Sequence, residues 1–271
     1  MHLLDKSTQL SDPDSLTPAV RRLAYSILMT DEEVGFFEGL QTNRMSFEPR
    51  DTIIRDGQEF EACYALVSGW AIAYRVTASG RRQIVNVLLP GDFLGLHTNF
   101  HRSCLYTCAA LTSLEVAVIE PMRLLEIYQK YPVLATGLDW ATVRSFNILS
   151  EHNVSLGARS AEQRILHFYL ELWCRLALIG EADEDGFAMP MTQEQVADAM
   201  GLTPVHTNRV LRRMQKEGII EAKNRFVSFP DPKRAAMEAD FDARFLQGLN
   251  KQTSSVERDR SVEKVLSAVA S

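Results

Sequence analysis

Polar and basic side chains gather on a short segment that begins near residue 203, in a pattern that suits contact with DNA. Thr203 is a helix N-cap, and Pro204 follows at the first helical position, where the missing N–H of proline costs no hydrogen bond. A recognition helix enters the major groove by its N-terminal end, so short polar side chains there reach base edges while Arg and Lys neutralise phosphates. The residues expected to contact DNA are Thr192, Thr203, Val205, His206, Asn208, Arg209, Arg212, Arg213 and Lys223.

Two helices and a hairpin are needed to position these side chains. Thr192 and Gln195 form the pattern of a capping box, which predicts a first short helix that Gly201 ends. The second helix runs from Thr203 to Gly218, and residues 219–229 predict two strands around a polar turn. Helix, glycine turn, helix and hairpin together predict a winged helix-turn-helix; an ordinary helical hairpin is the alternative.

The charge distribution supports a local nucleic-acid interface. The chain of 271 residues has a formal net charge of −6, which by itself argues against nucleic acid. Residues 203–225, however, contain six basic and two acidic residues. A basic segment on an acidic protein is the electrostatic footprint that a DNA-reading element needs.

An all-β region precedes the helices. Between about Met45 and Ile119, short alternating segments end at glycine-containing turns, which predicts a small sandwich or barrel. The strands are expected at 52–55, 64–67, 70–76, 84–89 and 114–119. Further helices are expected at Pro18–Met29 and Met122–Tyr131.

A long helix is expected over Val133–Leu156, and it carries two apolar stripes. Leu134, Leu138, Ala141 and Ile148 form one stripe, and Trp140, Val143, Phe146 and Leu149 form the other. A helix that is apolar on two sides packs against its own domain and against something else. The second partner is expected to be the same helix of another subunit; burial inside a larger single domain is the alternative.

The remaining segments are less informative. Ser160 and Gln163 form a capping box that predicts the start of a helix over 161–178. Residues 181–186 predict an acidic loop, and residues 235–249 are a candidate helix. Four cysteines do not make a disulfide framework, and we find neither a signal-peptide pattern nor an apolar run of about 20 residues. A cytoplasmic protein without a membrane partner is therefore expected.

These motifs resemble those of bacterial Crp/Fnr-type transcription regulators. The segments MTQEQVADAMGLT and RVLRRMQKEGII resemble the family's winged helix, and RSAEQRILHFYLEL resembles the helix before it. Upstream, YALVSGWAIAYR, GRRQIVNVLLPGDFLGL and LEVAVIE are similar to its cyclic-nucleotide-binding-like β-roll. The resemblance covers about residues 25–232.

The resemblance implies an α+β fold and a homodimeric, sequence-specific regulator. The implied parts are an N-terminal arm (1–24), a β-roll sensor (25–132), a dimerisation helix (133–158), a winged helix-turn-helix (159–232) and a C-terminal tail (233–271). Double-stranded DNA with a palindromic operator, RNA polymerase and a small-molecule effector of unknown identity are the implied partners. Arg209 aligns with the arginine that reads guanine, whereas Val205 replaces a glutamate that reads a neighbouring base in many members.

The sequence departs from the family's cyclic-nucleotide cassette. Leu96 stands where a glutamate holds the ribose, and Cys104 stands where an arginine pairs with the cyclic phosphate, a position that Arg102-Ser103 reaches only with a two-residue shift. Cyclic AMP is therefore not expected to bind in the usual way. No cysteine precedes Cys63, which argues against the iron–sulfur chemistry of the oxygen-sensing relatives. We expect no cofactor.

The sequence does not favour three other interpretations of the chain. His97, His101, Cys104 and Cys108 would share one face of a continuous helix and offer zinc ligands, but a strand expected from about Tyr106 breaks that face, and buried thiols are the simpler reading. A regulatory module of the kind attached to kinases or channels would lack the winged segment. An enzyme is not expected, because phosphate-loop, zinc-protease and nucleophile-elbow motifs are missing from the sequence.

Overall fold

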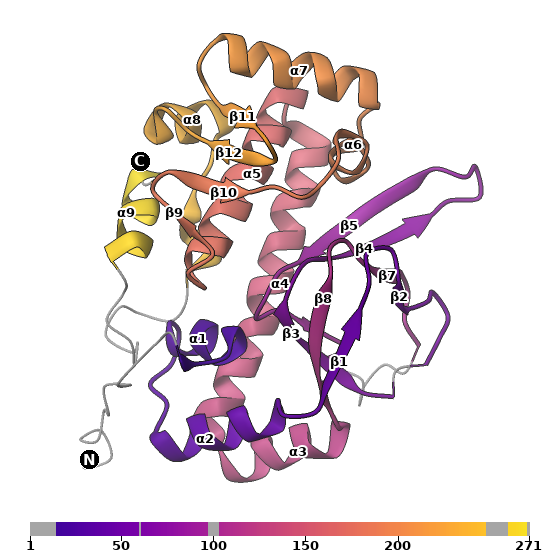
Figure 1. Ribbon diagram of the computed structural model, residues 1–271, viewed down its shortest axis with the longest axis vertical. Helices are drawn as coiled ribbons and strands as arrows, with labels where there is room; N and C mark the ends of the chain where they lie inside the picture. Colours follow the sequence, from indigo (N-terminus) through magenta and orange to yellow (C-terminus); the bar gives the residue numbers. More distant parts are fainter. Residues whose placement is uncertain (1–14, 60, 97–102, 248–259, 270–271) are drawn as a thin grey trace. The chain divides into compact units, whose positions relative to one another are not determined.

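The computed structural model describes residues 15–59, 61–96, 103–247 and 260–269, and it confirms the α+β class. The described residues fall into two compact units (Figure 1). Of the described residues, those within 15–73 and 87–145 belong to unit 1 together with Gln247, and those within 74–86, 146–246 and 260–269 belong to unit 2. The long helix α4 (Pro132–Ala158) contributes residues to both.

Two four-stranded sheets form the β-roll. The strand order is β1-β8-β3-β6 in one sheet and β2-β7-β4-β5 in the other. The strands are β1 (Arg44–Phe47), β2 (Thr52–Ile54), β3 (Cys63–Ser68), β4 (Ala71–Val76), β5 (Arg82–Leu88), β6 (Phe93–Leu94), β7 (Thr107–Ala110) and β8 (Leu114–Ile119). The five strands expected from alternation are present, and β1, β6 and β7 complete the sheets.

Three shorter helices accompany the β-roll: α1 (Pro18–Ala24), α2 (Asp31–Leu40) and α3 (Pro121–Lys130). Leu23 of α1, Phe37 of α2 and Leu124 of α3 are buried in one core with Leu134 and Leu138 of α4. The expectation that the first helix continues to Met29 is wrong, since it ends at Ala24. The N–H of Ser26 donates to the carbonyl of Leu23, three residues back, at 2.8 Å, which is the tighter 3₁₀ spacing.

One turn of the β-roll requires glycine. Gly91 has a φ of +83°, a conformation that other residues seldom adopt. A Cβ atom at this position would lie 2.7 Å from the carbonyl oxygen of Pro18, so a side chain would displace the start of α1. Gly91 therefore brings the turn before β6 against α1.

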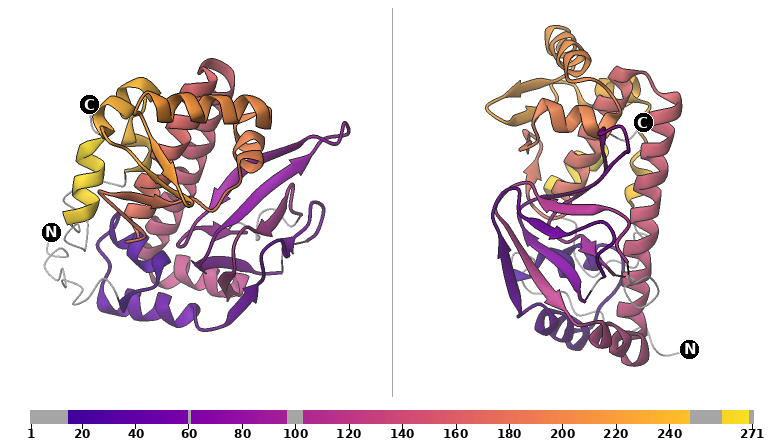
Figure 2. Two further views of the ribbon diagram at one scale, coloured as in Figure 1. Left: turned by 45° about the horizontal axis from the view of Figure 1, so that its top comes forward. Right: turned by 90° about the vertical axis from the view of Figure 1, so that its right-hand side faces the viewer.

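Unit 2 is built around α5 (Ala161–Ala177), which is buried from Ile165 to its end. The predicted capping box is confirmed, because Ser160 Oγ accepts from the backbone N–H of Gln163 and the Gln163 side chain accepts from that of Ser160. Around α5 lie the elements of a winged helix (Figure 2). They are β9 (Ala182–Asp183), β10 (Gly186–Ala188), α6 (Gln193–Met200), α7 (Pro204–Lys216), β11 (Glu221–Lys223), β12 (Phe226–Ser228), α8 (Pro232–Ala239), η2 (Ala243–Leu246) and α9 (Arg260–Ala268).

Two local expectations in unit 2 are wrong. The acidic loop over 181–186 contains β9 and leads into β10, because both strands join the wing in the sheet β11-β12-β10-β9. The helix expected over 235–249 ends at Ala239, because Asp240 adopts the left-handed conformation with a φ of +51°. The chain continues as η2. Val265 of α9 is buried, as is Val269 directly after that helix. Helices α8 and α9 pack against α5.

Candidate functional site

Local signals place helices α6 and α7 where the sequence predicts them. Thr192 Oγ1 accepts from the backbone N–H of Gln195 at 3.2 Å, which completes the first capping box. Gly201 ends α6 in the left-handed conformation, with a φ of +66°. Thr203 Oγ1 then accepts from the backbone N–H of His206 at 3.2 Å and starts α7. The apolar face of α7 is buried through Val210, Leu211 and Met214, so its polar face points outward.

The predicted DNA-contacting residues of α7 fall into two groups. Val205, His206, Arg209 and Arg212 are exposed along the outer face, next to the cap Thr203. Asn208 and Arg213 instead have protein partners. Asn208 Nδ2 donates to Gln193 Oε1 of α6 at 2.5 Å, and Arg213 forms an ion pair with Glu162 of α5. The exposed group is available to a ligand as it stands, whereas the other two have to exchange partners.

The wing is a tight hairpin that presents a lysine. Asn224 and Arg225 both have positive φ, at 54° and 60°, as a two-residue turn of type I′ requires. Lys223 pairs with Phe226 across this turn, and both are exposed. The backbone N–H of Met189 donates to the carbonyl of Arg225 at 2.8 Å, which ties the turn to the segment before α6. Lys223 is thus held on a short, braced hairpin.

The outer part of the β4–β5 hairpin contacts α6 within unit 2. Arg82 Nε donates to Asp198 Oδ2 at 2.6 Å, and Gln83 Nε2 donates to the carbonyl of Ala199 at 3.0 Å. The sequence analysis missed these two residues. Only the basic pair Arg81-Arg82 at the end of a predicted hairpin signalled an exposed polar contact there.

The second apolar stripe of α4 is largely solvent-exposed in the single chain. Leu134, Leu138 and Ile148 are buried, as expected for the inner stripe. On the other stripe, the exposed fractions are 56% for Val143, 68% for Phe146 and 44% for Leu149. Trp140 is an exception, because only 9% of it is exposed and its ring lies 5.8 Å from the guanidinium of Arg144.

A buried network of charges joins the C-terminal part of α4 to α5. His152 Nε2 lies 2.7 Å from Glu171 Oε2, and Arg175 Nη1 donates to Glu171 Oε1 at 2.8 Å. A second group places His167 Nε2 at 3.4 Å and Arg159 Nη2 at 2.9 Å from Glu151 Oε2. The network lies where the long helix meets the first helix of the winged unit.

The network keeps both glutamates ionised. Burial alone would raise the pKa of Glu171, but His152 and Arg175 outweigh it and lower the pKa to about 2. His167, together with Arg159, lowers the pKa of Glu151 to about 2. Glu171 is fully buried, so its stability as a carboxylate depends on these partners.

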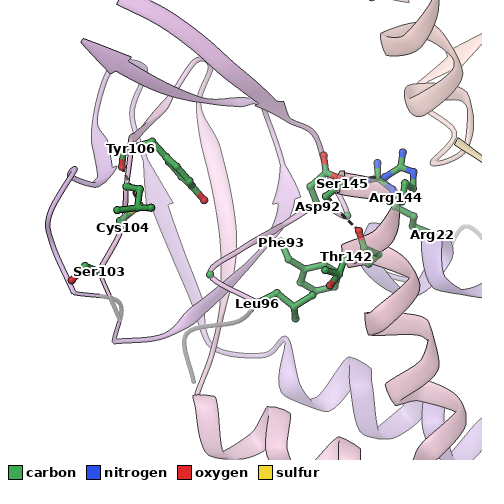
Figure 3. Close-up of a pocket in the computed structure, with 14 residues that line it drawn as sticks. Arg22, Asp92, Phe93, Leu96, Ser103, Cys104, Tyr106, Thr142, Arg144 and Ser145 are labelled. Atoms are coloured by element: carbon green, nitrogen blue, oxygen red, sulfur yellow. Dashed lines mark hydrogen bonds and ion pairs between the residues drawn. The ribbon is translucent and has the colours of Figure 1, made fainter. Parts of the chain in front are cut away.

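Unit 1 contains a cavity of about 280 Å³ between the β-roll and α4. Thr142, Arg144 and Ser145 of α4 line one side, and Cys104 and Tyr106 line the other (Figure 3). Phe93, Leu96 and Leu105 add apolar surface. The hydroxyls of Thr142 and Ser145 donate back to helix carbonyls, at 3.1 Å and 3.0 Å, so toward the cavity they act as hydrogen-bond acceptors.

Charged side chains lie at one end of this cavity. Arg22 of α1 and Arg144 of α4 both lie against Asp92, which follows Gly91 (Figure 3). Arg22 makes the close contact, while Arg144 Nη1 lies 3.5 Å from Asp92 Oδ1. Asp92 Oδ2 also accepts from the backbone N–H of Leu89 at 2.8 Å. The sequence analysis missed Arg22 and Arg144, because the residues that meet here are far apart in the chain.

The metal hypothesis finds no support in the part that the structure describes. His97 and His101 lie outside the described residues. Cys104 and Cys108 are buried, and burial raises the pKa of both thiols. Cys104 Sγ donates to the carbonyl of Tyr106 at 3.0 Å. Among described residues, no group of three His, Cys, Asp or Glu side chains is arranged to hold a metal, and no described helix could span a membrane.

Two family models match the chain, one on each side of α4. A cyclic nucleotide-binding domain matches residues 44–131, and a Crp-like helix-turn-helix domain matches 163–234. The chain is a Crp/Fnr-type transcription regulator. The winged helix and the β-roll therefore occur here in the order that the motifs predict.

Relatives and solved structures agree with this family. The chain is 26% identical over 216 residues to the nitrogen fixation regulation protein FixK of Bradyrhizobium diazoefficiens, covering 80% of this chain and 90% of that protein. It is 27% identical to the transcriptional activator protein FnrL of Cereibacter sphaeroides, covering 83% and 91%. The structure of FixK2 from Bradyrhizobium japonicum matches with a TM-score of 0.64 and 25% identity, covering 71% of this chain and 94% of that one.

The two positions at which the sequence is expected to depart from the family's cyclic-nucleotide cassette lie at the cavity. Leu96 and Cys104 both line it. Arg102 lies outside the described residues. Among the described residues that line the cavity, the basic ones are Arg22 of α1 and Arg144 of α4.

Proposed function

We propose that the protein is a homodimeric regulator that binds a palindromic DNA operator through α7. The observation that carries this proposal is the outer face of α7, where His206, Arg209 and Arg212 are exposed on a helix anchored by a buried apolar face. That arrangement supplies both base-reading and phosphate-binding groups at the start of a recognition helix.

Each predicted residue has a role that its position supports. Arg209 lies about one turn into α7, where it reaches the O6 and N7 atoms of guanine as a bidentate donor. His206 and Asn208 contribute to base reading in place of the acid that Val205 replaces. Thr192 and Thr203 offer hydroxyls and helix-terminus N–H groups to phosphates. Arg212, Arg213 and Lys223 bind phosphates, with Arg213 leaving Glu162 to do so.

The dimer forms through α4. Val143, Phe146 and Leu149 lie three residues apart on one exposed stripe, the spacing at which two helices pack along their length. A twofold dimer places two copies of α7 on two half-sites one DNA turn apart, which is how palindromic operators are read.

The sensor does not bind cyclic AMP in the usual way, because Leu96 and Cys104 supply neither the carboxylate nor the cation that the ligand needs. A different small molecule acts as effector, and RNA polymerase is the partner through which transcription changes. We place the protein in the cytoplasm.

Selection of bound duplexes from a random DNA library, with light scattering on the same preparation, tests the proposal. We expect a palindromic consensus and the mass of a dimer at micromolar concentration, with and without DNA. A monomer under both conditions, or recovery of sequences without twofold symmetry, would contradict it.

A further inference from the structure

An apolar side chain is exposed at the start of the DNA-reading helix. Val205 is the second residue of α7, and 72% of it is exposed. We propose that Val205 reads the operator by packing against the C5-methyl group of a thymine in the major groove. The inference rests on the proposed DNA-binding function and names a base that each half-site contains.

The position of Val205 on α7 directs it away from the core. The residues that α7 buries are Thr207, Val210, Leu211 and Met214. Arg209 and Arg212, four and seven residues after Val205, are exposed. Residues at these spacings share one face of a helix. Val205 therefore lies on the same outer face as the two arginines that are proposed to contact DNA.

The first turn of α7 holds Val205 in a defined conformation. Pro204 occupies the first helical position, and Thr203 Oγ1 accepts from the backbone N–H of His206 at 3.2 Å. These neighbours fix the backbone on both sides of Val205. A valine in a helix also has one strongly preferred χ1 rotamer. Little side-chain freedom is therefore lost when its methyl groups contact a base.

The chemistry of the major groove limits what an apolar side chain recognises. Guanine, cytosine and adenine present hydrogen-bond donors and acceptors there, whereas thymine presents an acceptor and a methyl group. Valine has no side-chain donor or acceptor, so packing it on a polar edge removes water without replacing the hydrogen bonds that the water made. Thymine is therefore the base whose edge suits Val205.

The contact expected for Arg209 limits where this thymine lies. Four residues of an α-helix span about 6 Å, and successive base pairs are about 3.4 Å apart. Because Val205 and Arg209 are four residues apart on one face, they reach base pairs that are at most about two steps apart. Each half-site should contain a thymine, on either strand, within about two base pairs of the guanine that Arg209 reads.

A glutamate in place of Val205 would read a different pyrimidine. A carboxylate accepts a hydrogen bond from the N4 amino group of cytosine, but it gains nothing from a methyl group. The valine thus replaces a polar contact with an apolar one at the same point of the helix. Val205→Glu should shift the preference at this base pair from thymine to cytosine.

Replacement of thymine by uracil removes only the methyl group, so it tests the contact without a protein variant. The probe is the operator duplex recovered by selection, with deoxyuridine in place of one thymine per half-site, each thymine taken in turn. At one position near the guanine, uracil should weaken binding of the full chain about fourfold per half-site, as expected when one methyl-sized group is no longer removed from water. Thymines outside the reach of α7 are the controls and should tolerate uracil.

Variants of exposed residues assign the contact to Val205. Val205→Ser should bind the thymine and uracil duplexes almost equally, since both changes remove the same contact and their effects do not add. Val205→Glu should prefer the duplex with cytosine at this position. Met237→Ala changes a similarly exposed apolar residue on α8 and should keep the full sensitivity to uracil. Melting temperatures of the three variants confirm that each is folded.

Three results would overturn the inference. They are tolerance of uracil at every thymine near the guanine, equal sensitivity to uracil in Val205→Ser and the unchanged chain, or a selected half-site without thymine in this range. In each case the duplex is still bound, so the DNA-binding function stands. Failure to recover any bound duplex would instead contradict the proposed function itself.

Discussion

The arginines of α7 and those of the unit 1 cavity are held in different ways. Arg209 and Arg212 are exposed on a helix face, while Arg22 and Arg144 are almost completely buried around Asp92. Exposed cations suit a polyanion, because neutralising DNA phosphates releases counterions and no cation has to be desolvated first. Buried cations need a carboxylate within the protein, as Asp92 provides here, because their desolvation is otherwise uncompensated.

Buried and exposed charges should therefore respond differently to substitution. The buried network between α4 and α5 gives the largest expected effect. Glu171→Ala removes the buried carboxylate that Arg175 Nη1 contacts at 2.8 Å, which should destabilise the protein by about 3–5 kcal/mol in denaturant unfolding. Glu238→Ala breaks a surface pair with Arg234 and should cost less than about 1 kcal/mol. Equal losses in both variants would remove the distinction between buried and exposed charge.

Acid should weaken the same network. Glu151 and Glu171 have pKa values of about 2 in the folded chain, against about 4.3 for a free glutamate. A lowered folded pKa contributes stability that is complete above the unfolded pKa and is lost as the pH falls toward the folded one. The free energy of unfolding should therefore decrease between about pH 5 and pH 2. Glu171→Gln should flatten that slope, and an unchanged slope would place the responsible groups elsewhere.

Substitution in the exposed apolar stripe of α4 should have the next largest effect, on dimerisation. Phe146→Asp puts a charge in the proposed interface, so light scattering should show a monomer and operator affinity should fall by about a hundredfold as avidity is lost. Met122→Asp changes an equally exposed apolar residue on α3 and should leave a dimer with full affinity. A dimeric Phe146→Asp variant would move the interface away from this stripe.

On the DNA-reading surface, base contacts and phosphate contacts should separate. Arg209→Ala should cost about 1–3 kcal/mol of discrimination for the operator and leave random DNA almost unaffected. Lys223→Ala should weaken both duplexes alike and reduce the salt slope by about one. Competition assays at two salt concentrations measure both. Equal losses with Arg209→Ala would assign Arg209 to the phosphates and leave specificity to His206 and Asn208.

The smallest effect is expected from cyclic AMP. At millimolar concentration it should change neither the melting temperature nor the operator affinity, because Leu96 and Cys104 offer no partner to its ribose or phosphate. A bound ligand at 100 times its dissociation constant would add about 2.7 kcal/mol, which thermal unfolding detects easily. A saturable shift of that size would show that the cavity accepts a cyclic phosphate by other contacts.

The sequence alone determined the elements whose signals are local. The capping pairs at Thr192 and Ser160 are confirmed, as is the glycine stop at Gly201, because each depends on residues within one turn of the chain. The outward face of α7 was predictable for the same reason, since helical spacing separates its apolar and polar sides. The two stripes of α4 were also visible, although tertiary packing buries Trp140.

Tertiary structure decided everything that depends on distant segments. Arg22, Asp92 and Arg144 meet only because Gly91 brings its turn against α1 and α4 passes the β-roll, and nothing in the spacing of these residues signals it. Strands β9 and β10 join the wing because the exposed edge of β12 can pair with any strand that packing brings beside it. The helical and strand periods of a sequence show which residues share one face of an element. Which other element packs on that face, and which charged residues meet at the cavity, is decided only by tertiary packing.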